Sequence, residues 1–205
     1  MKVKRTARRG RPRAFDTEEA LDRAMRVFWS KGYEGASLAD LTEAMGINRP
    51  SLYAAFGDKE ALFRQAIDRY DEMQATYVRT ALEAPTARAC VEQLLSGAAD
   101  FQTDPRTPAG CLQVQGALAC GDGAEVARKE LERRRAAGEA LVRRRLERAR
   151  SEGDLPSRAN PADLGRYVVT VVRGMAVQAA GGASRAELEP VIRMALRAWP
   201  PAGAG

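Results

Sequence analysis

The chain has 205 residues, a formal net charge of +6, 45% hydrophobic residues and 29% charged residues. This composition is that of a globular protein that can bury the core of one large or two modest domains. The chain contains no histidine, which excludes Ser-His-Asp and Cys-His catalysis and most zinc sites.

The cysteine spacing and the shortness of the apolar segments indicate the cellular compartment of the protein. Three cysteines, Cys90, Cys111 and Cys120, have no paired spacing, which argues against a disulfide scaffold and favours a reducing cytoplasm. No apolar run approaches the roughly 20 residues that span a bilayer. The basic N-terminus lacks the apolar segment of a signal peptide. We therefore expect a cytoplasmic protein with no membrane partner.

All of the excess positive charge lies in residues 1–14. Seven of the 33 Lys and Arg residues are there without any acid, which leaves 26 basic and 27 acidic residues elsewhere. We expect a disordered basic arm. Residues 9–13, Arg-Gly-Arg-Pro-Arg, resemble an AT-hook core, in which Gly and Pro keep the backbone flat and extended and Arg enters a narrow minor groove. Arg11 is a candidate for this contact; the alternative is a solvated tail that attracts phosphates without specificity.

The first helix is expected from its cap at Asp16 to about Lys31, with Gly32 ending it. Its apolar residues recur at helical spacing and form one buried stripe: Leu21, Ala24, Met25 and Phe28. This helix would support the segment that follows.

Residues 37–57 predict two short helices with a tight turn between them. Ser37 is an N-cap that begins a pair of the capping-box type, and Gly46 supplies the left-handed residue that ends the first helix. Asn48 caps the second helix, which has Pro50 in its first turn. This pattern is typical of a helix-turn-helix; the alternative is an ordinary helical hairpin within a bundle.

The outward side chains of the second helix suit contacts in the DNA major groove. Arg49 can donate two hydrogen bonds to guanine, and Pro50 and Ala54 offer apolar contact to a thymine methyl. Tyr53 and Lys59 suit phosphates, which position a helix without sequence specificity. The candidate DNA-binding residues are Arg11, Ser37, Arg49, Pro50, Ser51, Tyr53, Ala54 and Lys59.

A set of residues in this region resembles one family. The set comprises Phe28, Gly32, Ser37, Leu38-Ala39-Asp40-Leu41, Ala44, Gly46 and above all Ser51-Leu52-Tyr53 followed by Phe56, Lys59, Glu60 and Leu62. It resembles the TetR (tetracycline-repressor-like) family over roughly residues 15–65. The resemblance implies that residues 49–54 contact bases and phosphates and that the last two long helices form a dimer. Pro50 and Ala54-Ala55 replace the Gly and bulkier polar residues of many members, so the operator cannot be copied from a relative.

A long fourth helix begins after the cap at Asp58 and extends past the DNA-binding unit. One of its faces carries Leu62, Ala66, Tyr70, Met73 and Tyr77. Because a continuous helix is stiff, this helix is the expected mechanical link to the rest of the chain.

Beyond residue 84 the pattern stays helical, with a loop at 103–110, a short helix at about 111–120 and a long charged helix at about 124–152. The charged helix contains two Arg triplets, but Glu130/Arg134 and Glu139/Arg143 have i,i+4 spacing. A solvated, salt-bridged face is therefore favoured over a second nucleic-acid surface.

The last two helices carry more apolar surface than one core covers. The run Tyr167–Val172 has a strand-like composition, yet Val168, Val171 and Met175 keep helical spacing, so we predict a helix. A final helix is expected from about Ser184 to Ala198. Pairing of both helices with their copies across a two-fold axis would bury the excess.

The pattern of the C-terminal half predicts a helical bundle with an apolar interior. Apolar side chains of this kind usually line small-molecule pockets. The candidate ligand-binding residues are Tyr70, Met73, Tyr77, Phe101, Cys111, Gln115, Leu118, Tyr167, Val171 and Met175. For each residue taken singly, a place in a filled core is an equal alternative.

The sequence thus predicts an all-α protein: an N-terminal three-helix DNA-binding head with a helix-turn-helix, joined by a long helix to a C-terminal helical bundle that dimerises. The expected parts are a disordered basic arm (1–14), a DNA-binding domain (15–60), a ligand-binding and dimerisation domain (61–199) and a disordered tail (200–205).

The leading function is a homodimeric repressor that a small-molecule effector releases from an inverted-repeat operator in double-stranded DNA. The alternatives are an effector-independent architectural DNA-binding protein and a repressor that senses oxidants through Cys90, Cys111 or Cys120. A cysteine enzyme is a further, weaker alternative. No catalytic residue, metal or cofactor is predicted.

Overall fold

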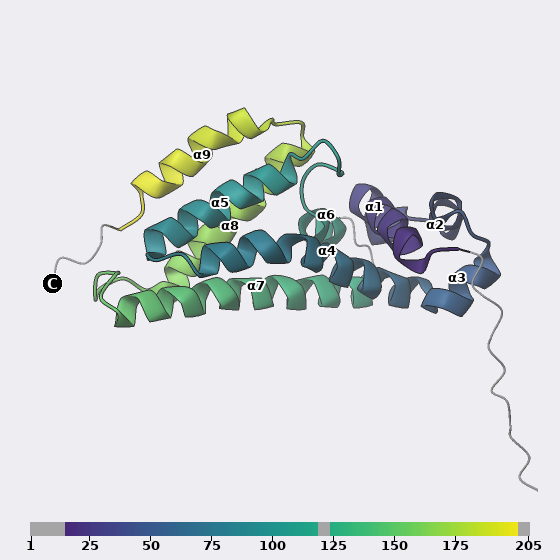
Figure 1. Cartoon of the computed structure of the whole chain (residues 1–205), viewed down its shortest axis with the longest axis horizontal. Coiled ribbons are helices and arrows are strands. Elements are labelled where there is room, and N and C mark those ends of the chain that lie inside the picture. The colour runs from purple at the N-terminus through teal and green to yellow at the C-terminus, as the bar shows by residue number, and fades with distance from the viewer. Residues whose placement is uncertain (1–14, 119–123, 201–205) are drawn as a thin grey trace, which may run out of the picture.

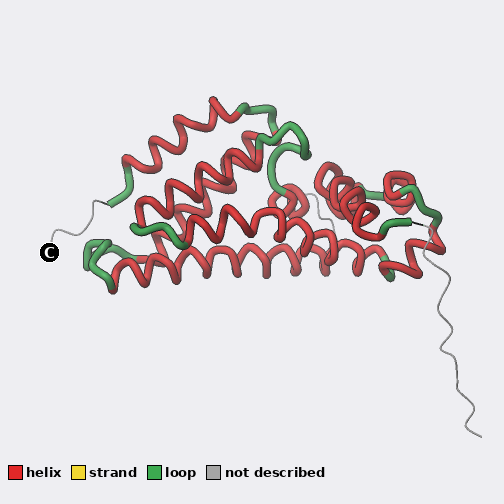
Figure 2. The backbone as a smooth tube through the Cα atoms, viewed as in Figure 1, coloured by secondary structure: helices red, strands yellow, loops and turns green. Residues whose placement is uncertain are grey.

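The computed structural model describes residues 15–118 and 124–200. Figure 2 shows these residues as helices joined by loops, and no strand occurs in them. The all-α prediction is confirmed. The helices are α1 (Thr17–Gly35), α2 (Leu38–Met45), α3 (Arg49–Phe56), α4 (Lys59–Leu82), α5 (Ala87–Gln102), α6 (Leu112–Leu118), α7 (Glu125–Ser151), α8 (Pro161–Ala180) and α9 (Arg185–Arg197).

The helices form two groups that α4 connects (Figure 1). Helices α1, α2 and α3 gather at one end, and we call them the head. Helices α5, α7, α8 and α9 gather at the other end, where α5 and α7 pack against α4, and we call them the body. The short α6 lies where the groups meet, in contact with both α1 and α7.

Side-chain caps begin the helices of the head at the predicted residues. Asp16, Ser37, Asn48 and Asp58 each accept hydrogen bonds from backbone N–H groups in the first turn of α1 to α4. Gly46 has φ 68° between α2 and α3, a left-handed conformation that glycine adopts without steric cost. The helix-turn-helix follows from these local signals.

Helix α1 continues beyond its predicted end at Lys31. Gly32 has φ 70° and ψ 177°, which kinks the helix, but a further turn follows it. After the kink, the Tyr33 ring stacks on Phe28 with centroids 6.2 Å apart and meets Phe63 of α4 edge-on at 5.0 Å. Packing against α4 therefore extends a helix that the glycine alone would end.

The hydrophobic core of the head includes residues from distant parts of the chain. Leu41 and Leu52 of the helix-turn-helix belong to the same buried cluster as Leu112 of α6 and Leu131 of α7. Packing is therefore continuous across the predicted domain boundary at residue 60, and that boundary stays a prediction.

Four aromatic side chains connect the head to the body, and we call them the aromatic chain. The Trp29 ring of α1 meets Tyr70 of α4 edge-on with centroids 4.8 Å apart and stacks on Phe101 of α5 at 5.6 Å. Phe101 also lies 6.1 Å from Tyr77. Through these contacts, α4 and α5 pack against the second half of α1.

The body has its own buried cluster, formed by α5, α7, α8 and α9 with the end of α4. Val168 and Val169 of α8 face this cluster together with Leu95 of α5 and Ile192 of α9. The apolar run around them is helical, as its spacing predicts.

Arginines of α7 attach this helix to α4. Arg134 pairs with Glu130 at 2.7 Å, with Asp68 of α4 at 2.5 Å and with Asp71 of α4 at 2.8 Å. Burial opposes the charge of Arg134, but its hydrogen bonds to Glu130, Asp68 and Asp71 outweigh that effect and raise the pKa of Arg134. The predicted Glu130/Arg134 pair is confirmed.

The second predicted pair of α7, Glu139/Arg143, is wrong. Arg143 pairs with Glu147 at 3.4 Å, and Glu139 pairs with Arg166 of α8 at 3.3 Å. Helix α8 packs against this side of α7, so Glu139 meets a partner from another helix that sequence spacing does not reveal.

Arg145 of α7 is also not solvated, although it belongs to an Arg triplet that was expected to face water. It is 5% exposed and donates to the carbonyl oxygens of Leu82 at 3.1 Å and Ala84 at 2.8 Å. These carbonyls lie at the C-terminal end of α4, where a cation is favourable. Arg145 thus fixes the far end of α4.

Candidate functional site

The exposed face of α3 is the candidate DNA-binding surface. Leu52 and Phe56 are buried and anchor the helix, whereas Arg49, Pro50 and Ala54 are exposed. Tyr53, 49% exposed, is one of the most exposed large apolar side chains. Ser51 is half-buried, and its backbone N–H donates to Asn48 Oδ1 at 2.9 Å. The predicted contact residues of α3 therefore share one end of the head, and Arg49 and Tyr53 are free to reach a groove.

The flanking candidates already have partners within the head. Ser37 Oγ accepts from the Asp40 N–H at 3.1 Å and donates to the Asp40 carboxylate at 2.7 Å. Lys59 Nζ lies 4.6 Å from the centroid of the Tyr33 ring, and burial lowers the pKa of Lys59. Arg11 lies outside the described residues. Contacts of these three residues with DNA stay predictions.

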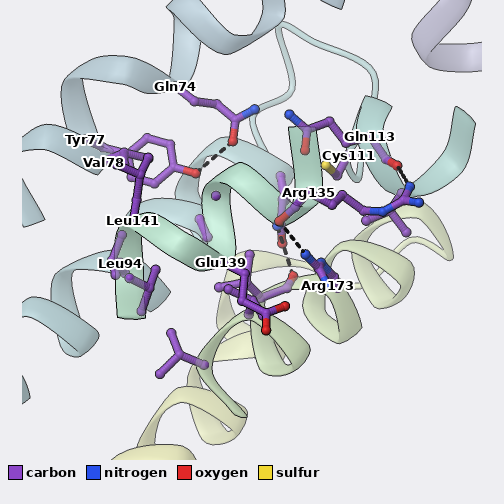
Figure 3. A pocket seen from close by; sticks show the side chains of 18 of the residues that line it. Gln74, Tyr77, Val78, Leu94, Cys111, Gln113, Arg135, Glu139, Leu141 and Arg173 are labelled. Carbon is purple, nitrogen blue, oxygen red and sulfur yellow. Dashed lines mark hydrogen bonds between the residues drawn. The ribbon is translucent and has the colours of Figure 1, made fainter. Parts of the chain in front are cut away.

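The candidate ligand site is a cavity of about 150 Å³ lined by residues of α4, α5, α6, α7 and α8 and by Cys111. Figure 3 shows Tyr77 and Val78 of α4 on one side and Arg135, Glu139 and Arg173 across from them. Most of the wall is aliphatic, with residues from α4, α5, α7 and α8: Val78, Leu82, Leu94, Ala98, Leu141, Val142, Val168, Val169 and Val172.

Two of the predicted ligand-binding residues, Tyr77 and Cys111, line this cavity. The Tyr77 hydroxyl donates to Gln74 Oε1 at 3.0 Å, as Figure 3 also shows. Burial raises the pKa of the Cys111 thiol and the pKa of the Tyr77 hydroxyl. Both groups are therefore neutral at physiological pH.

Seven of the other eight predicted residues have described side chains, and none of the seven lines the cavity. Tyr70 is fully buried in the core of the head, and Met73 and Phe101 pack against that core. Gln115 and Met175 also lie off the cavity wall, with Met175 buried in the core of the body.

Tyr167 and Val171 line a shallow surface pocket with α9 instead. The side chain of Leu118 lies outside the described residues. The predicted residues are therefore spread over the core of the head, the cavity, the core of the body and the outer face of α8.

Sequence reasoning missed the polar part of the cavity wall. Gln102, Gln113, Arg135, Glu139 and Arg173 line it. The sequence singles out Arg173, because it is the only charged residue in the apolar run from 167 to 180. It does not single out Arg135, since this residue lies within an Arg triplet of a helix that is charged along its length.

The polar groups of the cavity are mostly held by backbone carbonyls. Arg135 Nη1 donates to the Gln113 carbonyl at 2.8 Å, and Arg173 Nη2 donates to the Arg135 carbonyl at 3.1 Å (Figure 3). Gln102, 4% exposed, donates from Nε2 to the Val172 carbonyl at 3.2 Å, and its Oε1 finds no hydrogen-bond partner among the described residues. Burial and the neighbouring charge of Arg135 lower the pKa of Arg173.

Helices α8 and α9 present large exposed apolar side chains on their outer face. Tyr167, Val177, Val191 and Met194 are 37%, 50%, 41% and 60% exposed. Gly174 lies among them, and a Cβ added there would meet nothing within 4 Å. The face is therefore open and apolar.

Other kinds of site are not found in the described chain. Among residues 15–118 and 124–200, no group of three or more Cys, Asp or Glu residues could hold a metal ion. Within the same ranges, none of the helices has the length and hydropathy required to cross a bilayer.

A helix-turn-helix head with an exposed second helix, joined through one long helix to a body with an internal cavity, defines a class of DNA-binding regulator. The family model for bacterial regulatory proteins of the tetR family matches residues 20–66, and the model for the tetracyclin repressor-like C-terminal domain matches residues 86–195. The chain belongs to the TetR family of transcriptional regulators.

Proteins that are similar to this chain align with nearly its whole length. The HTH-type transcriptional repressor ComR of Escherichia coli (strain K12) is 34% identical over 195 residues, which are 94% of this chain and 92% of ComR. The TetR family transcriptional regulator CifR, solved as a cysteine mutant with 26-bp double-strand operator DNA, is 46% identical with a TM-score of 0.89 and covers 93% of this chain and 100% of its own. Reduced E. coli NemR, 20% identical with a TM-score of 0.75 over 92% of this chain and 98% of its own, shares the fold.

Proposed function

We propose that this chain is a homodimeric transcriptional repressor that binds an inverted-repeat operator and releases it when a small molecule occupies the cavity. The observation that carries the proposal is the exposed face of α3, on which Arg49, Pro50, Tyr53 and Ala54 project from a helix that Leu52 anchors. The repressor name of ComR and the operator complex of CifR support repression and operator binding.

The outer face of α8 and α9 supports a dimer. Its apolar side chains, among them Val177 and Met194, would be buried by a second copy of the same face across a two-fold axis. Two heads related in this way would bind two half-sites with centres about 34 Å apart, or a multiple of that distance.

Helix α4 is the element that we expect to transmit the signal. A ligand can release DNA only if it binds more tightly to a conformation in which the two heads are wrongly spaced. Tyr77 of α4 lines the cavity and touches Phe101 of the aromatic chain, which reaches Trp29 in the head. We propose that a ligand beside Tyr77 tilts α4 and moves both α3 helices.

The surroundings of Cys111 and Cys90 argue against a thiol trigger. A thiolate, not a thiol, reacts with oxidants, and burial raises the pKa of Cys111 and of Cys90. Cys120 lies outside the described residues. The raised pKa values of the two described cysteines thus favour a ligand trigger over a thiol trigger.

The experiment that tests the proposal is selection of bound fragments from random DNA with the purified chain, followed by footprinting. We expect one short inverted repeat. Uniform protection of arbitrary DNA would instead support the architectural alternative.

Arg49→Ala tests the role of α3 directly. If Arg49 donates two hydrogen bonds to a guanine, its loss should weaken binding to the operator by about 1–3 kcal/mol. Binding to random DNA should weaken much less, because these hydrogen bonds form only with the matching base. Binding to both DNAs should be measured at fixed salt concentration. Arg144→Ala, which removes an exposed arginine of α7, is the control and should change neither affinity. Equal losses on the two DNAs would show that Arg49 contacts only phosphate.

A further inference from the structure

The size of the cavity restricts its ligand. A volume of about 150 Å³ is that of a cavity that accommodates a benzene-sized molecule, and drug-sized ligands require larger pockets of about 300 Å³ or more. A molecule of about the size of benzene therefore fits the cavity without rearrangement of the body. The aliphatic wall, with Leu94, Val142 and Val168 among its members, requires that most of this molecule be apolar.

The charge of the cavity restricts the ligand further. Arg135 and Arg173 both line it, and among the described residues neither forms an ion pair. Each uses a backbone carbonyl as an acceptor, and a guanidinium has five N–H donors, so donors remain on both. The one carboxylate in the wall, Glu139, pairs with Arg166 at 3.3 Å. The wall thus carries two cations and one anion that is already shared with a third arginine.

Two like charges in the wall of an apolar cavity are unfavourable until an anion joins them. Burial and the charge of Arg135 lower the pKa of Arg173, while Glu139 acts in the opposite direction with a smaller effect. A carboxylate beside both guanidinium groups would form charge-assisted hydrogen bonds, which are shorter and stronger than neutral ones. The site is therefore better suited to an anion than to a neutral molecule of equal shape.

A ligand has a route into the cavity between α4 and α7. A surface groove between these helices shares Val78, Gly138 and Leu141 with the cavity wall. A Cβ added at Gly138 would meet nothing within 4 Å, and Leu141 is 40% exposed. The groove is therefore open where it meets the cavity.

We propose that the cavity binds a small amphipathic monocarboxylate, whose carboxylate is held by Arg135 and Arg173 and whose apolar part lies among the aliphatic residues. This inference rests on the proposed function and names the chemical class of the effector.

The test uses two pairs of probes that differ in charge and not in shape: benzoate with benzamide, and hexanoate with hexanamide. Each is titrated into the purified full chain by calorimetry at concentrations up to about 10 mM. We expect at least one acid to bind about tenfold or more tightly than its amide. Failure of both acids to bind, or equal affinities within both pairs, overturns the proposal.

Arg173→Met locates the contact. It should weaken binding of the acid about tenfold or more and leave binding of the amide nearly unchanged. Arg173→Lys, which keeps the charge, should retain a preference for the acid and provides a second variant if Arg173→Met does not fold. Arg144→Met, in which an exposed arginine of α7 is replaced, is the matched control and should bind the acid as the wild type does. An unchanged preference for the acid in Arg173→Met overturns the assignment.

Measurements of operator binding distinguish a wrong effector class from a wrong proposed function. If the wild type binds a selected operator but neutral amides release it better than acids, the effector class is wrong and the proposed function stands. If no operator is found, the proposed function fails, and calorimetry still decides whether the cavity binds acids.

Discussion

The Asp40 carboxylate stabilises two helices of the head at once. It accepts from Lys31 Nζ of α1 at 2.6 Å, and from the Ser37 hydroxyl at 2.7 Å and the Ser37 N–H at 3.0 Å at the start of α2. These hydrogen bonds, that from Lys31 foremost, lower the pKa of Asp40 to about 2. Its charged form is therefore the one that the folded head prefers.

This preference predicts a pH dependence. A free Asp side chain has a pKa of about 3.9, so the folded-state pKa is the lower one, and the contribution of Asp40 to stability is present above about pH 4 and lost as the pH falls toward 2. Asp40→Asn should therefore lower the thermal midpoint at pH 7, and the difference from wild type should shrink across that window. Glu43→Gln, at an exposed carboxylate of α2, is the control. A difference that stays constant from pH 7 to pH 2 would contradict the prediction.

At the scale of single residues, caps could be predicted and cavity contacts could not. Ser37, Asn48 and Asp58 each bond to a backbone N–H three residues later, so the information lies within one turn of the chain. Arg173 and Gln102 acquire their partners from residues 38 and 70 positions away. The acceptors of Arg173 and Gln102 therefore depend on how the helices pack against one another, which sequence spacing does not reveal.

At the scale of elements, α4 and α5 pack tightly against each other at Gly97. A Cβ at this position would lie 2.7 Å from Cδ2 and 3.1 Å from Cγ of Tyr77. Those atoms belong to the base of the ring, so the whole side chain would have to move. The position of Tyr77 in the cavity wall thus depends on a glycine of the neighbouring helix.

Gly97→Ala should therefore destabilise the body, although alanine favours a helix more than glycine does. We expect a loss of about 1–3 kcal/mol from overpacking, measured as the free energy of unfolding in urea. Gly138→Ala provides the matched control. There an added Cβ meets nothing within 4 Å, so a gain of about 0.5–1 kcal/mol is expected. Stabilisation by both substitutions would show that Tyr77 moves without cost.

Helix spacing predicted which elements exist but not which side chains form the cavity. Tyr70 and Tyr77 lie on the same face of α4, seven residues apart, and both were expected at the ligand site. Tyr70 instead packs on Trp29 in the head and Tyr77 reaches the cavity. The difference arises because α1 covers the first half of α4 and leaves the second half to the body.

At the scale of the whole molecule, the apolar face of α8 and α9 should decide the oligomeric state. Met194→Asp places a charge on its most exposed large apolar residue, 60% exposed. Burial of an unpaired carboxylate in an interface is unfavourable, so we expect a monomer in sedimentation experiments. Operator affinity should fall with it, because one head binds one half-site.

Val126→Asp is the control for that experiment. Val126 is 43% exposed on α7, away from the α8 and α9 face, and its substitution should leave the dimer intact. A dimeric Met194→Asp variant, or a monomeric Val126→Asp variant, would show that the chains pair through another surface.

The aromatic chain gives the molecule an optical reporter of its own. The sequence has two tryptophans; Trp199 lies in the body cluster, whereas Trp29 stacks on Phe101 and meets Tyr70 at the junction with the head. Because Trp29 is fully buried, its fluorescence depends on how closely those rings pack around it. With Trp199 replaced by Phe, the emission of a single indole would follow the position of the head in real time, without an attached dye.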